Sequence, residues 1–173
     1  METTQATTTT RDIVITVPVF INNGQREDWT FDTTEFRLTE QNLQDQEMKI
    51  AHAHSQWSLV LAWYKNAILN LDNKRACEEA RDKAIAQDGL SKRGIKLTSE
   101  TAKKDALYTY QDGQTYPFAE RVLMYENKRA ELQYYQDIVA NAILKSLDIE
   151  KDMLITLSAN DRARYRTTVN TIN

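Results

Sequence analysis

The stretch 39–88 constrains the fold more than any other part of the chain, because it contains neither glycine nor proline. Its apolar side chains recur at seven-residue spacing along two neighbouring rows. One row is Leu43, Ile50, Trp57, Tyr64 and Leu71, and the other is His54, Leu61 and Ile68, with Ala53, Val60 and Ala67 beside it. This spacing predicts one long amphipathic helix, ending at Gln87-Asp88-Gly89, that packs along a second helix.

A second long helix is predicted to begin at Pro117, after a loop over 89–97 and a short helix capped by Thr98. Its inward row is Phe118, Val122, Tyr125, Leu132, Tyr135, Val139, Ala142, Ile143 and Ser146, continued by Ile149, Met153 and Leu157. Ser158-Ala159-Asn160-Asp161 is expected to cap a separate short helix that carries Arg162, Arg164 and Arg166. Asn70, Asp72 and Asn73 are poor helix formers, so a kink is expected there in the first helix.

Before the helices, the sequence predicts a β-hairpin. Apolar residues occupy the odd positions of 13–21, Asn22-Asn23-Gly24-Gln25 is a turn signal, and Trp29 and Phe31 alternate with polar residues. Pro18 cannot donate a ladder hydrogen bond, so its strand should lie at an edge or carry a bulge. Because two strands alone are marginal in water, this arm must lie on the helices or pair with another subunit.

The predicted fold class is therefore mainly α: a long helical hairpin with a short inserted helix and an N-terminal β-hairpin arm. The expected organisation is a flexible tail over 1–11, the arm over 12–32, a helical domain over 33–157 and a short basic helix or tail over 158–173. One hairpin leaves apolar flanks without cover, which favours a homo-oligomer. The residues expected at its interface are Trp57, Trp63, Tyr64, Tyr134 and Tyr135.

Catalytic and metal-binding patterns are missing from the sequence. His52 and His54 lie two residues apart, so on a helix they point in nearly opposite directions, and the lone Cys77 lies beside two glutamates that disfavour its thiolate. The four glycines form neither a phosphate loop nor a dinucleotide turn. We therefore expect a non-enzymatic protein without cofactor or metal. No apolar run is long enough for a membrane span, and the Thr-rich start does not resemble a secretory signal.

Charge is distributed unevenly along the chain, whose formal net charge is −3. Residues 1–50 hold four basic and nine acidic side chains, whereas residues 74–104 hold nine basic and five acidic ones. A local excess of cations can attract phosphates although the whole chain is acidic. The candidate nucleic-acid-binding residues are Lys74, Arg81, Lys83, Lys92, Arg93 and Lys96. Tyr108, Tyr110 and Tyr116 follow, and either stack on bases or pack in the core.

Several short motifs resemble those of one protein family. They are Asp32-Thr33-Thr34-Glu35-Phe36, His54-Ser55-Gln56-Trp57, the Lys/Thr/Glu-rich run over 96–104, and Leu132-Gln133-Tyr134-Tyr135. In this order, over roughly 29–149, the chain is similar to the UvsY-type recombination mediators of tailed phages. The resemblance implies a helical, ring-forming homo-oligomer that binds single-stranded DNA. Such a protein helps load a recombinase onto strands coated by single-strand-binding protein, in the cytoplasm of a phage-infected host cell.

Arg81 matches one of two basic positions that contact DNA in this family. The other position falls on Glu79, where Lys83 or Lys74 would have to compensate, and the hairpin arm has no clear counterpart in the family. The arm favours an alternative, a structural or virion-assembly protein that oligomerises through its long helices. A third hypothesis is an inhibitor that binds a host protein through its acidic N-terminal part.

Overall fold

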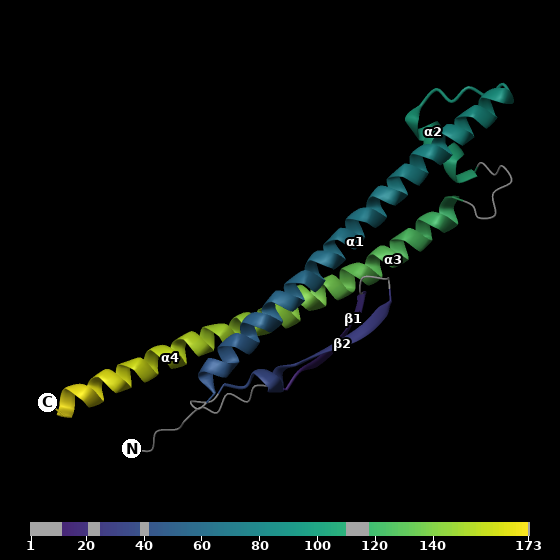
Figure 1. The fold of residues 1–173 in the computed structure, drawn as a ribbon. Helices are drawn as coiled ribbons and strands as arrows, with labels where there is room; N and C mark the ends of the chain where they lie inside the picture. Colours follow the sequence, from purple (N-terminus) through teal and green to yellow (C-terminus); the bar gives the residue numbers. More distant parts are fainter. Residues whose placement is uncertain (1–11, 21–24, 39–41, 110–117, 173) are drawn as a thin grey trace, which may run out of the picture. The chain divides into compact units, whose positions relative to one another are not determined.

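The computed structural model describes residues 12–20, 25–38, 42–109 and 118–172, without the side chains of 107–109, 118–119 and 164–172. In chain order the elements are β1 (Val14–Phe20), β2 (Arg26–Asp32), the 3-10 turn η1 (Thr33–Phe36), α1 (Leu43–Lys92), α2 (Glu100–Thr109), α3 (Phe118–Ile138), the π-helical segment η2 (Val139–Leu144) and α4 (Lys145–Ile172) (Figure 1). The predicted mainly α fold with a long helix and an N-terminal β-hairpin is confirmed.

The chain forms two compact units. Unit 1 comprises Met1–Leu61 together with Asp137–Asn173, and unit 2 comprises Ala62–Gln136. Unit 1 thus contains the hairpin arm, the first part of α1, η2 and α4, whereas unit 2 contains the rest of α1, α2 and most of α3.

The hairpin arm is a two-stranded antiparallel sheet without a bulge. Its register runs without interruption from Val14 opposite Asp32 to Phe20 opposite Arg26. The backbone N–H of Thr33 donates to the carbonyl of Ile13 at 3.1 Å, so these two residues form a hydrogen-bonded pair. Hydrogen-bonded and non-hydrogen-bonded pairs alternate along an antiparallel ladder, and the even-numbered residues of β1 therefore occupy the non-hydrogen-bonded positions. The missing N–H of Pro18 therefore removes no bond between β1 and β2, which explains how a proline fits inside this strand.

The arm packs on α1 of its own chain, which was one of the two predicted arrangements. The ring of Trp57 lies edge-on to Trp29, with centroids 6.1 Å apart, and to Phe31, with centroids 6.2 Å apart. Val17 is completely buried, and Phe31 and Trp57 are nearly so. The expectation that Trp57 remains uncovered in one copy of the chain is therefore wrong, because the arm covers it.

Polar contacts order the segment between the arm and the start of α1. Asp32 accepts a hydrogen bond from the backbone N–H of Thr34 at 2.8 Å, which caps η1. Hydrogen bonds from the side chain and the backbone of Thr34 lower the pKa of the Asp32 carboxyl. The buried Gln46 donates its side-chain amide to the carbonyl of Glu35 at 3.2 Å. The carbonyl of Asn42, the residue before α1, accepts the first helical bond from the backbone N–H of Gln46 at 3.0 Å.

Helix α1 runs longer than the sequence predicted. It continues as α-helix through Asn70 and Asn73, and it passes Gly89 to end at Lys92. The end is set by Gly94, which has a φ of +77°. The N–H of Ile95 donates to the Leu90 carbonyl at 3.0 Å, and the N–H of Gly94 donates to the Ser91 carbonyl at 2.9 Å, which is a Schellman motif.

Helix α2 is capped by Ser99 rather than by Thr98. The Ser99 hydroxyl accepts from the backbone N–H of Ala102 at 3.1 Å, and its carbonyl accepts from Lys103 at 3.1 Å. Serine and threonine are both good cap residues, so the sequence alone did not distinguish these two neighbours.

From the π-helical segment η2 onward, the buried positions differ from those of the predicted inward row. Val139 and Ile143 are completely buried, as expected, but beyond them Leu147 and Leu154 are buried while Ile149 and Met153 are about half exposed. The buried positions are displaced by one residue from the predicted Ser146 and Met153 because a π turn accommodates one extra residue per turn.

Helix α4 also has no break at residues 158–161, so the predicted separate terminal helix is wrong. A contact of 3.3 Å between His54 Nε2 and Asp148 Oδ1 joins α1 to α4 in unit 1. The predicted tail over 1–11, most of the arm's turn, and Tyr110 and Tyr116 lie outside the described residues, as do the side chains of Tyr108, Arg164 and Arg166.

Candidate nucleic-acid interface

A ladder of ion pairs joins α1 to α3 in unit 2. Both helices contribute acidic and basic partners. Residue numbers rise along α1 as they fall along α3, so the helices are antiparallel. The pairs are Asp72–Arg129 (3.1 Å), Arg75–Glu126 (3.2 Å), Glu78–Arg121 (3.7 Å) and Asp82–Arg121. The stacked rings of Tyr64 and Tyr135 extend the same register, with centroids 6.1 Å apart.

One end of this ladder is buried. The Asp82 side chain is 5% exposed and that of Arg121 is 19% exposed, whereas those of Asp72 and Arg129 are both more than 40% exposed. A buried carboxylate requires a cation close by. Asp82 has Arg121 across the interface and Arg81 on its own helix, at 3.5 Å.

Other acidic side chains of unit 2 pair within their own helices. The pairs are Glu79–Lys83 (2.8 Å), Asp88–Lys92 (2.6 Å), Glu100–Lys103 (2.6 Å) and Glu131–Lys128 (2.7 Å). The hydrogen bond from Lys83 lowers the pKa of Glu79, and the bond from Lys103 lowers the pKa of Glu100. Most of the acidic charge in unit 2 is thus matched locally by a partner of opposite sign.

The predicted basic residues separate into two faces of α1. Arg81 follows Lys74 by seven residues, and Lys92 follows Arg81 by eleven. At 3.6 residues per turn these spacings are close to two and three full turns, so the three side chains project from nearly the same face of α1. We call these three residues the cationic row. Lys83 lies nine residues, or two and a half turns, from Lys74 and therefore points to the opposite face, where it is bonded to Glu79.

The row continues past the end of the helix. Arg93 and Lys96 are both exposed in the segment that follows α1, and the Arg81 side chain is 61% exposed. Within the described residues, no ion pair joins Lys74 or Lys96 to an acidic side chain. The structure therefore groups Lys74, Arg81 and Lys92, with Arg93 and Lys96 following, and separates Lys83 from them.

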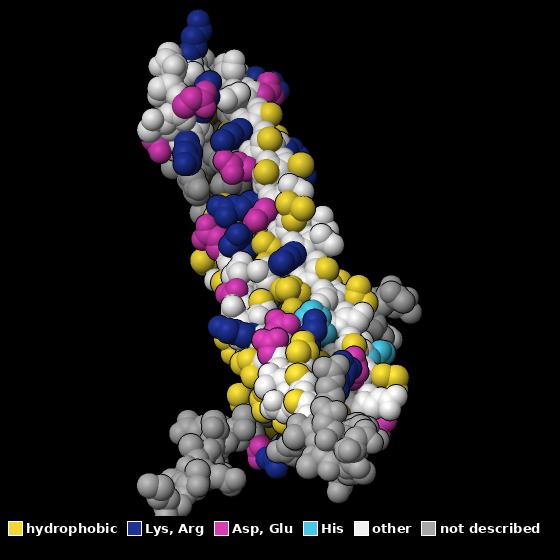
Figure 2. All heavy atoms as spheres, turned by 90° about the vertical axis from the view of Figure 1, so that its left-hand side faces the viewer, with side chains coloured by type: hydrophobic (Ala, Val, Ile, Leu, Met, Phe, Trp, Pro, Cys, Tyr) yellow, Lys and Arg dark blue, Asp and Glu magenta, His cyan; other side chains and the backbone are white. Residues whose placement is uncertain are grey.

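The balance of basic and acidic side chains differs between the two units. Unit 2 carries thirteen basic and eleven acidic side chains in the sequence, whereas the rest of the chain carries nine basic and fourteen acidic ones. Figure 2 shows that Lys and Arg side chains alternate with Asp and Glu on the visible face rather than merging into one continuous basic patch. The surplus of cations over acids is therefore small and lies in unit 2.

The residues predicted for an oligomer interface differ in exposure. Tyr64 is completely buried, Trp63 and Tyr135 are half-buried, and Tyr134 is 62% exposed. Trp57 and Tyr64 contribute to the core of the chain itself. Among the five candidates, only Tyr134 has most of its surface exposed.

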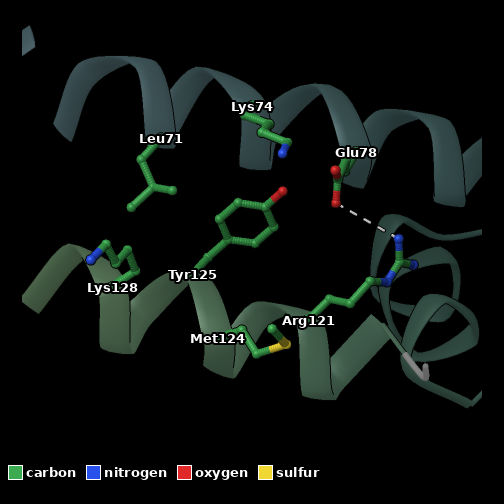
Figure 3. Close-up of a pocket in the computed structure, with 7 residues that line it drawn as sticks. All are labelled: Leu71, Lys74, Glu78, Arg121, Met124, Tyr125 and Lys128. Atoms are coloured by element: carbon green, nitrogen blue, oxygen red, sulfur yellow. Dashed lines mark ion pairs between the residues drawn. The ribbon is translucent and has the colours of Figure 1, made fainter. Parts of the chain in front are cut away.

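Sequence reasoning missed one feature of unit 2, a pocket of about 510 Å³ between α1 and α3 (Figure 3). Its lining residues are Leu71, Lys74, Glu78, Arg121, Met124, Tyr125 and Lys128. Tyr125 was assigned to the inward row of its helix because aromatic residues at helical spacing usually pack in a core. The sequence gives no signal for the pocket, because it depends on how two distant segments are aligned.

No protein family, curated protein or solved structure that we compared with this chain matches it. Among the residues that the structure describes, no cluster of three or more His, Cys, Asp or Glu side chains is arranged to hold a metal ion. Over the same residues, we find no helix with the length and apolar character that crossing a membrane would require.

Proposed function

We propose that this protein is a non-enzymatic single-stranded-DNA-binding protein that acts as a recombination mediator. In this role it helps load a recombinase onto strands coated by single-strand-binding protein in the cytoplasm of a phage-infected cell. The observation that carries the proposal is the arrangement of charge in unit 2. Its acidic side chains are largely matched by local partners, and the basic residues Arg81, which also contacts Asp82 at 3.5 Å, Arg93 and Lys96 are exposed near one end of α1.

A cationic row suits a single strand better than a sequence-specific duplex site. From Lys74 to Lys92 the row extends about 27 Å along α1, at 1.5 Å per residue. Phosphate contacts of this kind are sequence-independent and depend strongly on salt. Since one row offers few contacts, repetition of the row in a homo-oligomer would raise the affinity through avidity.

The test is a titration of a labelled short single strand, followed by fluorescence anisotropy at several salt concentrations. The variant replaces Arg81, Arg93 and Lys96 together with glutamine. We expect the wild-type affinity to fall steeply with salt, and the variant to lower the slope of log K against log [salt] by about 2, since each contact contributes about 0.7.

The control variant replaces Lys49, Lys145 and Lys151 of unit 1, all exposed, with glutamine. It changes the net charge by the same amount but leaves the cationic row intact. An equal loss of DNA affinity in both variants would show that binding depends only on the total charge of the protein. Absence of binding at low salt would end the proposal.

A second candidate, a structural or assembly protein, is favoured by exposed apolar side chains. Leu123 and Tyr134 lie eleven residues apart on one face of α3, and both are more than half exposed. Such a face suits contact with further copies of the chain. Light scattering after gel filtration tests it: a wild-type oligomer should become smaller when Leu123 and Tyr134 are replaced with glutamate. Recovery of the protein in purified virus particles would favour assembly over mediation.

A further inference from the structure

The pocket between α1 and α3 has the size and composition of a ligand site. Its volume of about 510 Å³ falls within the range of roughly 300–1,000 Å³ that is common for small-molecule sites. Leu71, Met124 and the ring of Tyr125 supply apolar surface, while cationic groups from both helices surround it. A site of this kind suits a ligand with a flat apolar part and an attached anionic group.

Tyr125 is the central residue of the pocket. It extends from α3 towards α1, and its hydroxyl is directed between Lys74 and Glu78 (Figure 3). Burial raises the pKa of the Tyr125 hydroxyl, and the neighbouring Glu78 carboxylate, to which it is hydrogen-bonded, raises it further. The hydroxyl therefore stays protonated and bonded to Glu78, which in turn pairs with Arg121 at 3.7 Å. This chain of contacts fixes the orientation of the aromatic ring.

The cations beside the ring come from two helices. Lys74 belongs to α1 and is exposed, and within the described residues it forms no ion pair with an acidic side chain. Lys128 belongs to α3, where Glu131 pairs with it at 2.7 Å. Lys74 is at the same time the first member of the cationic row, so the pocket opens beside the row that would follow a DNA backbone.

We propose that this pocket takes one nucleobase of a bound single strand, which stacks on the ring of Tyr125 while the adjoining phosphate lies against Lys74. The proposal rests on the proposed function and extends it, because it adds a base contact to a surface otherwise limited to phosphates. Aromatic stacking tolerates all four bases, since each has a π-face, so it would raise affinity without reading sequence.

The experiment compares two strands that differ only in their bases. The full-length protein is titrated with a short single strand and with a strand of the same length in which abasic residues replace the nucleotides, so that the phosphates are unchanged. We expect the natural strand to bind about tenfold more tightly, the scale that alanine substitutions of stacking residues give. The salt slope should be the same for both strands, because their phosphate contacts are the same.

Three variants locate the effect. Tyr125→Leu should abolish the difference between the two strands, Tyr125→Phe should retain it because the ring remains, and Tyr134→Leu should retain it because that exposed tyrosine lies elsewhere on α3. As a measurement on the wild-type protein, a strand carrying 5-iodouracil is photo-crosslinked and the adduct is mapped by mass spectrometry. We expect the adduct at Tyr125, and this result decides the matter if Tyr125→Leu does not fold.

The outcomes separate this inference from the proposed function. Salt-dependent binding that is equal for natural and abasic strands, or a difference that survives in Tyr125→Leu, would overturn the base pocket and leave the phosphate-binding proposal standing. A crosslink found only at other residues would do the same. Failure to bind either strand would overturn both proposals.

Discussion

Replacing Arg121 with methionine should strongly destabilise the chain, because it removes the interhelical partner of the buried Asp82. Of the two arginines beside this carboxylate, Arg81 then remains, at 3.5 Å on the same helix, and its side chain is 61% exposed. The Asp82 side chain is 5% exposed and Arg121 is its interhelical partner. Breaking a buried ion pair by removing one member costs about 3–5 kcal/mol. Because Arg121 itself retains 19% exposure, we expect a value near the lower end, about 3 kcal/mol.

Urea denaturation monitored by circular dichroism measures this cost. With a slope of about 2 kcal/mol per molar urea, a loss of about 3 kcal/mol lowers the midpoint by roughly 1.5 M. The double variant Asp82→Leu with Arg121→Met should recover most of the loss, since apolar replacement of a whole buried pair is often neutral or stabilising.

The chain offers a matched control on the same helix. Arg129 pairs with Asp72 across the same interface, but both side chains are more than 40% exposed, so Arg129→Met should cost about 0.5 kcal/mol. Equal effects of Arg121→Met and Arg129→Met, or a loss below about 1 kcal/mol for Arg121→Met, would refute the argument that burial decides the value of these pairs.

Three further predictions concern stability. Trp57→Ala removes the ring on which the arm packs and should cost about 3–5 kcal/mol in urea unfolding, whereas Tyr134→Ala, at 62% exposure, should stay within about 0.5 kcal/mol of wild type. Gly94→Ala, at a φ of +77°, should destabilise by about 1–2 kcal/mol, but Gly89→Ala, inside α1, should be neutral or stabilising; a loss in both would contradict the cap assignment. Asp32 has a lowered pKa, so its capping contribution is present above its ordinary value of 3.8 and is lost as the pH falls through the lower value in the folded chain. Asp32→Ala should therefore flatten that part of the acid-unfolding profile, and an unchanged profile would contradict the cap.

Much of the helical core could be predicted from spacing. Ile50, Trp57 and Tyr64 were placed on one row by their seven-residue interval, and all three are buried. The interval works because 3.6 residues per turn brings every seventh side chain back to nearly the same face. The same reasoning failed after Val139, where the π-helical segment η2 displaced the buried positions to Leu147 and Leu154.

The candidate site was predictable only in part, for a related reason. The grouping of Lys74 with Arg81 follows from spacing along one helix, and the structure retains it. The pocket around Tyr125 requires α1 and α3 to meet in one particular register, which the ladder of ion pairs helps to set. Such pairing between residues about fifty positions apart leaves no local pattern in the sequence.

The π-helical segment Val139–Leu144 affects any alignment of this chain with another sequence of the same fold. A wide turn of this kind is equivalent to one residue inserted into an α-helix. A relative that lacks it would keep the same buried side chains only if its sequence were one residue shorter at this point. Residues equivalent to Leu147 and Leu154 should therefore align only after a single-residue gap is placed within this segment. Without the gap, an ungapped comparison would set the core residues of α4 against exposed ones, rotated by about 100° around the helix, and would hide the relationship over the whole C-terminal part.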